Sequence, residues 1–249
     1  MSRIAIELVP RDEVSLLTEL DLIKNNFPVV DTINIPDLLR YEIRSWEGCT
    51  YAQPNYKYVI PHIRAIDINL DQPLRMADFF KEKNINEVLV IKGDPPQDMT
   101  HKIYPSTSID VIRKFKEEIP GIKVYAGIDQ YRDSMRKEAD YIKQKIYAGA
   151  DGFFTQPFFD LRLMEIYSEI LEGKEVYWGI SPVTSEKSLN YWETKNNVVF
   201  PTNFQPNLAW NIEFAQKALE FTGRTNANIY FMPIRTDVHK YLQGIFAGN

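Results

Sequence analysis

Eight short runs of β-branched and aromatic residues recur along the chain, and an amphipathic stretch follows each of them. This alternation is typical of parallel α/β folds, because each helix returns the chain to the start of the next strand. Eight units without a break in composition favour a TIM (β/α)8 barrel, formed as one catalytic domain over residues 1–249. A doubly wound sheet has about six strands and usually a glycine-rich first turn, whereas the first turn here, residues 8–11, contains no glycine. The dinucleotide fingerprint and the P-loop are both absent.

The expected elements can be placed by residue number. Strands are predicted at 4–9, 29–35, 58–63, 87–91, 123–128, 152–156, 175–180 and 228–232. Helices are predicted at 12–25, 38–46, 72–83, 109–118, 133–147, 161–171, 208–221 and 236–246. Residues 192–206 form the longest irregular segment, and we expect a loop there over one face of the barrel.

Composition excludes several classes of function. The net charge is −5 and the basic residues are scattered, which argues against a nucleic-acid partner. Cys49 is the single cysteine, so an internal disulfide and a cysteine-based zinc site are excluded. His62, His101 and His239 lie far apart in the sequence, and no metal is expected. The sequence contains no apolar run of ~18 residues and no basic-then-apolar start, so we expect a cytoplasmic protein without membrane contact.

A carboxylate interrupts the first apolar strand, in the segment Ile-Ala-Ile-Glu-Leu-Val that contains Glu7. Burying a lone charge is costly, so such a group is paired, protonated or used chemically. By alternation Glu7 lies on the face opposite Ile6 and Leu8, and one of these faces is the barrel interior. Two interpretations remain open: a structural carboxylate bonded to a neighbouring strand, or a general acid with a raised pKa.

A Thr-Gln pair ends the sixth strand, where Thr155 and Gln156 follow an apolar run. An amide at this end has no packing purpose, and ligands of parallel α/β folds bind at the carboxyl ends of the strands. Gln156 is therefore predicted to form hydrogen bonds with a substrate.

Other strand ends also carry polar or turn residues, each of which has a structural alternative. His62 could be an ordinary hydrogen-bonded rim histidine, and the segment 92–96, Lys-Gly-Asp-Pro-Pro, is also good turn chemistry. Similar residues end most of the other expected strands, namely Asn34, Asp37, Gly127, Asp129 and the segment 179–183. Taken together, they predict an enzyme with its site at the top of a barrel.

In this order the segments resemble methylenetetrahydrofolate reductase of the bacterial type, a flavin-dependent TIM barrel. The resemblance extends from residues 7–10 to residues 229–232 and is most specific at 61–62, 92–96, 149–160 and 179–183. This chain looks like a divergent, short member of that family.

The resemblance assigns roles residue by residue. The family's proton donor to the pterin falls on Glu7, and its carboxylate beside the flavin pyrimidine falls on Asp94, so these two would be catalytic. The pterin amide falls on Gln156, with Thr155 beside it in the substrate site. FAD would be held by Asn34, Asp37, His62, Lys92, Gly93, Asp94, Gly127, Asp129 and Lys145.

The implied reaction is the reduction of 5,10-methylenetetrahydrofolate, or a related tetrahydropterin, to its 5-methyl form through bound FAD. NAD(P)H or a partner protein would supply the electrons, within one-carbon metabolism and methionine biosynthesis. Flavin carries the hydride chemistry, and the protein contributes orientation and local charge. The expected partner is the small-molecule tetrahydropterin, and a homo-oligomer or an electron-donor subunit stays open.

Two departures from the family keep other functions open. Residues 32–40 contain no glycine where the family commonly has a glycine-rich segment against the flavin, and Lys92 stands where it usually has Arg. One alternative is a flavin-free reductase that transfers hydride directly from a nicotinamide to the pterin. The other is a non-catalytic pterin-binding subunit of a one-carbon complex.

Overall fold

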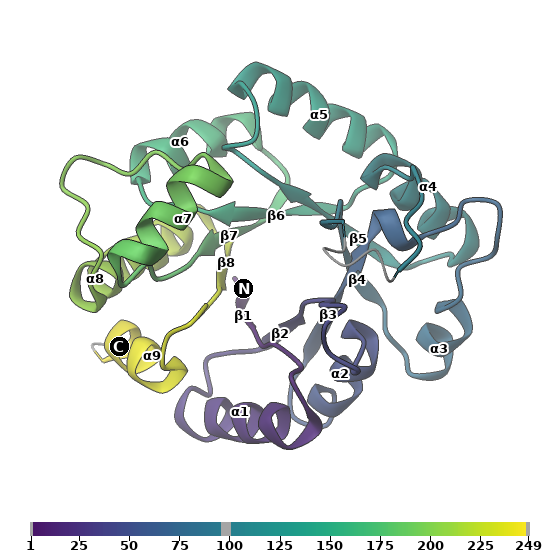
Figure 1. Cartoon of the computed structure of the whole chain (residues 1–249), viewed down its shortest axis with the longest axis horizontal. Helices are drawn as coiled ribbons and strands as arrows, with labels where there is room; N and C mark the ends of the chain where they lie inside the picture. The colour runs from purple at the N-terminus through teal and green to yellow at the C-terminus, as the bar shows by residue number, and fades with distance from the viewer. Residues whose placement is uncertain (1, 96–100, 248–249) are drawn as a thin grey trace.

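Parallel strands pair in chain order, and the last pairs with the first, so the sheet closes into a barrel (Figure 1). The computed structural model describes residues 2–95 and 101–247, and this part of the chain contains eight strands. They are β1 Ile4–Glu7, β2 Thr32–Ile35, β3 Tyr58–Arg64, β4 Glu87–Ile91, β5 Lys123–Ile128, β6 Gly152–Pro157, β7 Glu175–Ile180 and β8 Asn228–Phe231. The predicted TIM barrel is confirmed.

Helices surround the barrel on its outside (Figure 1). Those of the described residues are α1 Glu13–Asn26, α2 Ser45–Ala52, α3 Ala77–Glu82, α4 Ser108–Glu118, α5 Met135–Tyr147, α6 Leu161–Ile170, α7 Glu186–Asn196, α8 Leu208–Thr225 and α9 Val238–Phe246. Several begin at a side-chain cap: the Asp12 carboxylate, for example, accepts a hydrogen bond from the Ser15 amide at 2.8 Å.

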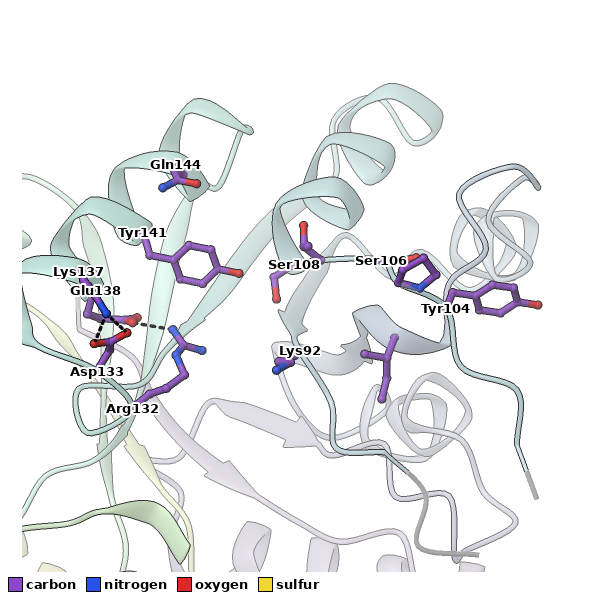
Figure 2. A pocket seen from close by; sticks show the side chains of 13 residues that line it. Lys92, Tyr104, Ser106, Ser108, Arg132, Asp133, Lys137, Glu138, Tyr141 and Gln144 are labelled. Atoms are coloured by element: carbon purple, nitrogen blue, oxygen red, sulfur yellow. Dashed lines mark hydrogen bonds and ion pairs between the residues drawn. The ribbon is translucent and has the colours of Figure 1, made fainter. Parts of the chain in front are cut away.

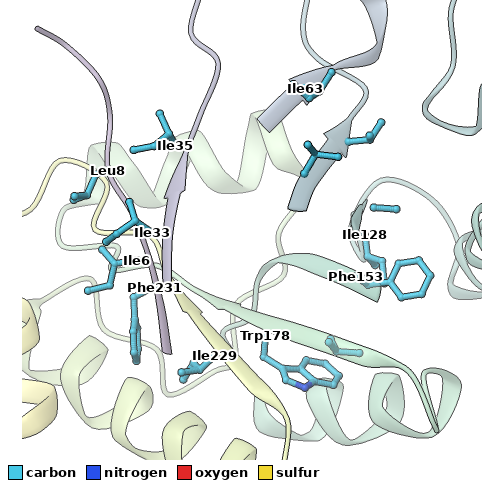
Figure 3. Close-up of a cluster of buried hydrophobic side chains, with 14 of the residues drawn as sticks. Ile6, Leu8, Ile33, Ile35, Ile63, Ile128, Phe153, Trp178, Ile229 and Phe231 are labelled. Carbon is cyan, nitrogen blue, oxygen red and sulfur yellow. The ribbon is translucent and has the colours of Figure 1, made fainter. Parts of the chain in front are cut away.

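The main hydrophobic core lies between the strands and the surrounding helices (Figure 3). Ile6 and Leu8 of the first strand segment and Ile33 and Ile35 of β2 belong to this outer core, and all are almost fully buried. Because side chains alternate along a strand, the residues between them, Glu7 among them, face the interior of the barrel.

A second cluster fills the barrel interior. Its members are Ala5, Ile60, Leu89, Tyr125, Phe154, Tyr177, Tyr230 and Met232. Phe154 stacks on Tyr177 with ring centroids 4.0 Å apart and meets Tyr125 and Tyr230 edge-on at 5.2 and 5.1 Å. These rings make the barrel a packed core rather than a channel.

Ion pairs close the amino-terminal end of the barrel. Arg3 binds Glu87 at 2.7 Å, and Lys123 binds Glu175 at 2.6 Å. The Tyr125 hydroxyl donates to the same Glu175 carboxylate at 2.9 Å, which links the rings of the interior to this charged layer. At the other end, the residues at and just after the carboxyl end of β1, Glu7 and Val9, line a cavity.

The predicted helix at 38–46 is wrong, because the helix begins at Ser45 and continues to Ala52. Asp37 forms an ion pair with Arg44, and its other oxygen accepts from the Ser45 amide at 3.3 Å. These contacts hold residues 38–44 as turns and place the start of α2.

Two further boundaries differ from the expectation. The helix predicted at 72–83 is confined to α3, because Pro73 disfavours helical geometry before it and the Leu74 amide donates to Glu118 of α4 at 2.6 Å. The segment 192–206 is irregular only beyond α7, which ends at Asn197 in the left-handed conformation with φ 54°. The following residues pack Phe200 on Phe159, with centroids 4.7 Å apart, beside the end of β6.

No helix in residues 2–95 and 101–247 has both the length and the apolar character required to cross a membrane.

The ring cluster generates a stability prediction. We expect Phe154→Ala to lower the free energy of unfolding by about 3–5 kcal/mol, because it leaves a cavity among three tightly packed rings. Urea unfolding followed by circular dichroism measures this. Tyr147→Ala, at a side chain that is 87% exposed, should change it by less than about 0.5 kcal/mol. A loss below about 1 kcal/mol for Phe154→Ala would contradict the packing argument.

Candidate active site

Glu7 ends β1 and faces the barrel interior above Ala5. Its side chain is 15% exposed, and burial raises its pKa to about 7. The Tyr230 hydroxyl donates a short hydrogen bond to Oε2, which acts against this rise. Glu7 therefore keeps its proton to a higher pH than an ordinary carboxyl does, as a general acid requires.

Two further polar side chains share this end of the barrel. Asn34 is the register partner of Glu7 on β2, and His62 lies on β3, with its Nε2 3.9 Å from Glu7 Oε2. Both Asn34 side-chain polar atoms and His62 Nε2 are buried without a hydrogen-bond partner among the described residues. Burial lowers the pKa of His62 to about 3, so its ring is neutral. Unsatisfied buried groups are costly, and a bound polar ligand would satisfy them.

The Thr155-Gln156 pair lies in a strand irregularity. The pairing of β6 with β7 shifts between Phe154 and Pro157, and Gln156 is the exposed residue within the shift. Thr155 is buried, and its Oγ1 accepts from the Gly179 amide at 2.8 Å. Thr155 thus holds β6 to β7, while the Gln156 side chain is presented at the surface.

Glycine at position 179 keeps this irregularity in place. A Cβ there would lie 2.5 Å from the Thr155 carbonyl oxygen and 3.0 Å from that of Gln156. Gly127, at the corresponding end of β5, is half-buried and likewise leaves the upper layer of the barrel without a side chain.

The turn after β4 is supported by an arginine. Gly93 adopts φ 82°, and a Cβ there would lie 2.9 Å from that of Arg64. Arg64 is buried and donates to the Asp94 carbonyl at 2.6 Å, while the Lys92 and Asp94 side chains are exposed. Pro96, which ends this sequence motif, lies outside the described residues.

Lys145 is enclosed by protein rather than open to solvent. Its side chain is 2% exposed, donates to the Gly127 carbonyl at 2.6 Å and lies 3.6 Å from Glu138. Burial lowers its pKa to about 8. Asp129 is also half-buried, and its Oδ1 accepts from the Tyr131 amide at 3.1 Å.

A cavity of about 550 Å³ opens between α4 and α5 (Figure 2). Lys92 lies at its base, Tyr141 of α5 on one wall and Ser108, at the first turn of α4, on the other (Figure 2). Arg132 is paired with Glu138 at 2.6 Å and Lys137 with Asp133 at 3.1 Å, so these four charges cancel. Lys92, for which the described residues supply no ion pair, leaves the cavity net positive, and a helix N-terminus favours anions.

A second cavity, of about 320 Å³, has Glu7 in its lining. Arg40 and Arg235 line it together with the aromatic ring of Tyr191 on α7, and so does Arg11, which pairs with Glu19 at 3.0 Å. The acid is therefore accessible from a space that is otherwise basic and partly aromatic.

A family model described as methylenetetrahydrofolate reductase matches residues 51–225. The chain belongs to this family. The matched span contains His62, Lys92 and Gln156, whereas Glu7 and Asn34 precede it.

Curated relatives agree with this membership. The 5,10-methylenetetrahydrofolate reductases of Buchnera aphidicola and Escherichia coli are each 25% identical over 146 residues, or 57% of this chain. The match covers only about half of each relative, 50% and 49%.

A solved structure shares the fold over nearly the whole chain. It is an uncharacterized protein from Clostridium thermocellum that binds two copies of 5-methyl-5,6,7,8-tetrahydrofolic acid, with a TM-score of 0.61 at 13% identity. The similarity covers 99% of this chain and 93% of that one. At this identity, the likeness supports the fold alone.

The structure brings together Glu7, Asn34 and His62, and it places Lys92 in the separate cavity beside α5. Sequence reasoning missed Tyr230, whose hydroxyl binds Glu7, although its place on the interior face of the last strand was readable from alternation. It also missed Gln130, whose Nε2 donates to the Gln156 carbonyl at 2.9 Å and whose position two residues beyond β5 carried no such signal. The binding and catalytic roles assigned from the resemblance stay predictions.

The contact between Tyr230 and Glu7 generates a prediction about proton affinity. Tyr230→Phe should raise the Glu7 pKa above about 7, because it removes the hydrogen bond that favours the ionised carboxylate. Titration of ¹³C-labelled glutamate side chains, with the Glu7 resonance assigned from Glu7→Gln, measures this directly.

Tyr241→Phe is the matched control, because the Tyr241 hydroxyl is buried and lacks a partner among the described residues. It should leave the Glu7 titration in place. An unchanged Glu7 pKa in Tyr230→Phe would contradict the inferred contact.

Proposed function

We propose that the protein reduces a methylene-tetrahydropterin to its methyl form, with Glu7 as the proton donor. The observation that carries this proposal is a protonatable carboxyl with a pKa of about 7 beside unsatisfied polar groups at the carboxyl end of the barrel strands. Family membership supports the same reaction class.

The pterin ring would lie over Glu7, between Asn34 and Gln156. Protonation of the bridging nitrogen outside the pterin ring opens the one-carbon bridge and leaves an iminium on the pterin nitrogen, and the carboxyl of Glu7 would supply this proton at neutral pH. The amide of Gln156 can donate and accept at once, which suits the mixed donor and acceptor edge of a pterin.

The second cavity supports a folate-type substrate. Arg40 and Arg235 line it beside Glu7, with Arg11, which pairs with Glu19 at 3.0 Å, and guanidinium groups bind carboxylates well. A pterin bound over Glu7 would extend its carboxylate-bearing tail into this basic space. Tyr191 would pack against the aromatic ring that joins the pterin to this carboxylate-bearing tail.

The cavity between α4 and α5 would hold part of FAD. Its volume of about 550 Å³ falls within the ~300–1,000 Å³ typical of ligand sites. Lys92 and the first turn of α4 would hold the phosphates, and Tyr141 would contact an aromatic ring. FAD would supply the hydride for reduction of the one-carbon unit, and NAD(P)H or a protein would supply the electrons.

A flavin-free reductase is the second candidate, and the loop after β2 favours it. Asp37 is engaged by Arg44 and by the Ser45 amide, so it has little capacity left to bind a flavin. In that case hydride would pass from a nicotinamide to the pterin directly. A non-catalytic pterin-binding subunit, the third expectation, would bind the substrate without turnover.

Removal of the acid tests the main proposal. We expect Glu7→Gln to lower pterin reduction by about 10²- to 10⁴-fold, because the amide cannot donate the required proton, while the affinity for FAD stays unchanged. Glu172→Gln, at the opposite end of the barrel, should behave as the wild type. Wild-type turnover should also decline as the pH rises through about 7. Unchanged turnover in Glu7→Gln would refute the assignment.

Flavin binding has its own test. Lys92→Met should weaken FAD binding about tenfold, the loss of one charge-assisted contact worth ~1.4 kcal/mol. Titration of the flavin absorbance measures it, with Lys143→Met, outside the cavity, as the control. A protein that binds no FAD but oxidises NAD(P)H with methylene-tetrahydrofolate would establish the second candidate.

A further inference from the structure

Gln156 is the one residue of β6 that lacks a register partner on either side. The pairing with β5 ends at Thr155, and the pairing with β7 resumes only at Pro157. Pro157 has no amide hydrogen to donate, so the ladder cannot hold this peptide from its next residue. Register pairing is therefore interrupted at Gln156 and resumes directly after it, so a side chain can hold this backbone in addition to the sheet.

Gln130 does this from the neighbouring strand end. It follows β5, is 7% exposed, and its Nε2 donates to the carbonyl oxygens of Gln156 at 2.9 Å and of Pro157 at 3.1 Å. Both amide hydrogens are thus used on the bulged peptide. Tyr131 adds a third contact, since its hydroxyl donates to the Pro157 carbonyl at 3.0 Å.

The Gln130 side-chain oxygen indicates that this position requires the donor group, Nε2, rather than the whole amide. Gln130 Oε1 is buried and has no hydrogen-bond partner among the described residues, which is a destabilising arrangement. An apolar side chain would avoid this cost, but the Gln156 carbonyl would lose this donor and the Pro157 carbonyl would keep only the Tyr131 hydroxyl.

We propose that Gln130 is a positioning residue that sets the direction of the Gln156 side chain toward the substrate. It touches the backbone of Gln156 and Pro157 and not the reacting atoms, so its effect on a ligand passes through the Gln156 side chain that this backbone carries. This inference rests on the proposed function, because it takes Gln156 as the residue that binds the pterin.

A double-mutant cycle on ligand affinity tests the proposal. The dissociation constant of 5-methyltetrahydrofolate is measured by calorimetry for the wild type, Gln130→Ala, Gln156→Ala and the double variant, with FAD affinity as the control. We expect each single change to weaken binding roughly tenfold, and the double variant to be no weaker than Gln156→Ala. FAD affinity should stay constant in all four proteins.

Independent effects, in which the double variant loses the product of the two single losses, would overturn the proposal. Gln130→Met keeps the side-chain volume and serves if Gln130→Ala does not fold. It should reproduce the loss, because it lacks the donor.

A second readout does not need the pterin. The side-chain amide resonances of Gln156 should broaden or shift in Gln130→Met, while those of Gln144 on α5 should not. Unchanged Gln156 resonances would overturn the positioning role. Failure of the wild type to bind any tetrahydropterin would instead overturn the proposed function, so the two failures can be told apart.

Discussion

The pairing of β8 with β1 is the constraint on which the rest of the structure depends. It closes the barrel and places the Tyr230 hydroxyl against Glu7, a residue 223 positions away in the chain. In an open sheet, Glu7 would stand on an edge strand in water and keep an ordinary pKa. Closure removes that water, and desolvation then raises the pKa toward neutrality. The raised pKa of Glu7 thus depends on the fold as much as on the residue type.

The two ends of the barrel differ in how completely their buried polar groups are paired. At the amino-terminal end, Arg3 and Lys123 each meet a carboxylate at hydrogen-bond distance, so burial there is compensated. At the other end, Asn34 and His62 are buried with polar atoms unsatisfied by the described residues. Such groups lower stability unless a ligand completes them, which is the usual conflict between stability and function at a binding site. This difference supports the proposal that ligands bind at the carboxyl end of the strands.

The fold was predictable because each strand is marked by the same local pattern of residues. β-branched and aromatic runs separated by amphipathic stretches identify eight units, and the interior position of Glu7 follows from alternation with Ile6 and Leu8. The helix predicted at 38–46 failed for a reason that periodicity cannot detect. Its position depends on the Asp37 carboxylate reaching Arg44 and the Ser45 amide. Helix boundaries that depend on such side-chain contacts cannot be predicted from the pattern of apolar residues.

The type of a residue also predicts its role less well than its surroundings do. Lys145 matches a flavin-site lysine in sequence, yet its ammonium donates to the Gly127 carbonyl and is almost fully buried beside Glu138. Asp37 is likewise engaged by its neighbours. Lys92 differs, since its side chain is exposed and lies in a cavity whose other charges cancel. A group already bound to protein must break that contact before it can bind a ligand, which reduces the net gain. Anion binding in this chain should therefore depend on Lys92 and the start of α4 more than on Lys145.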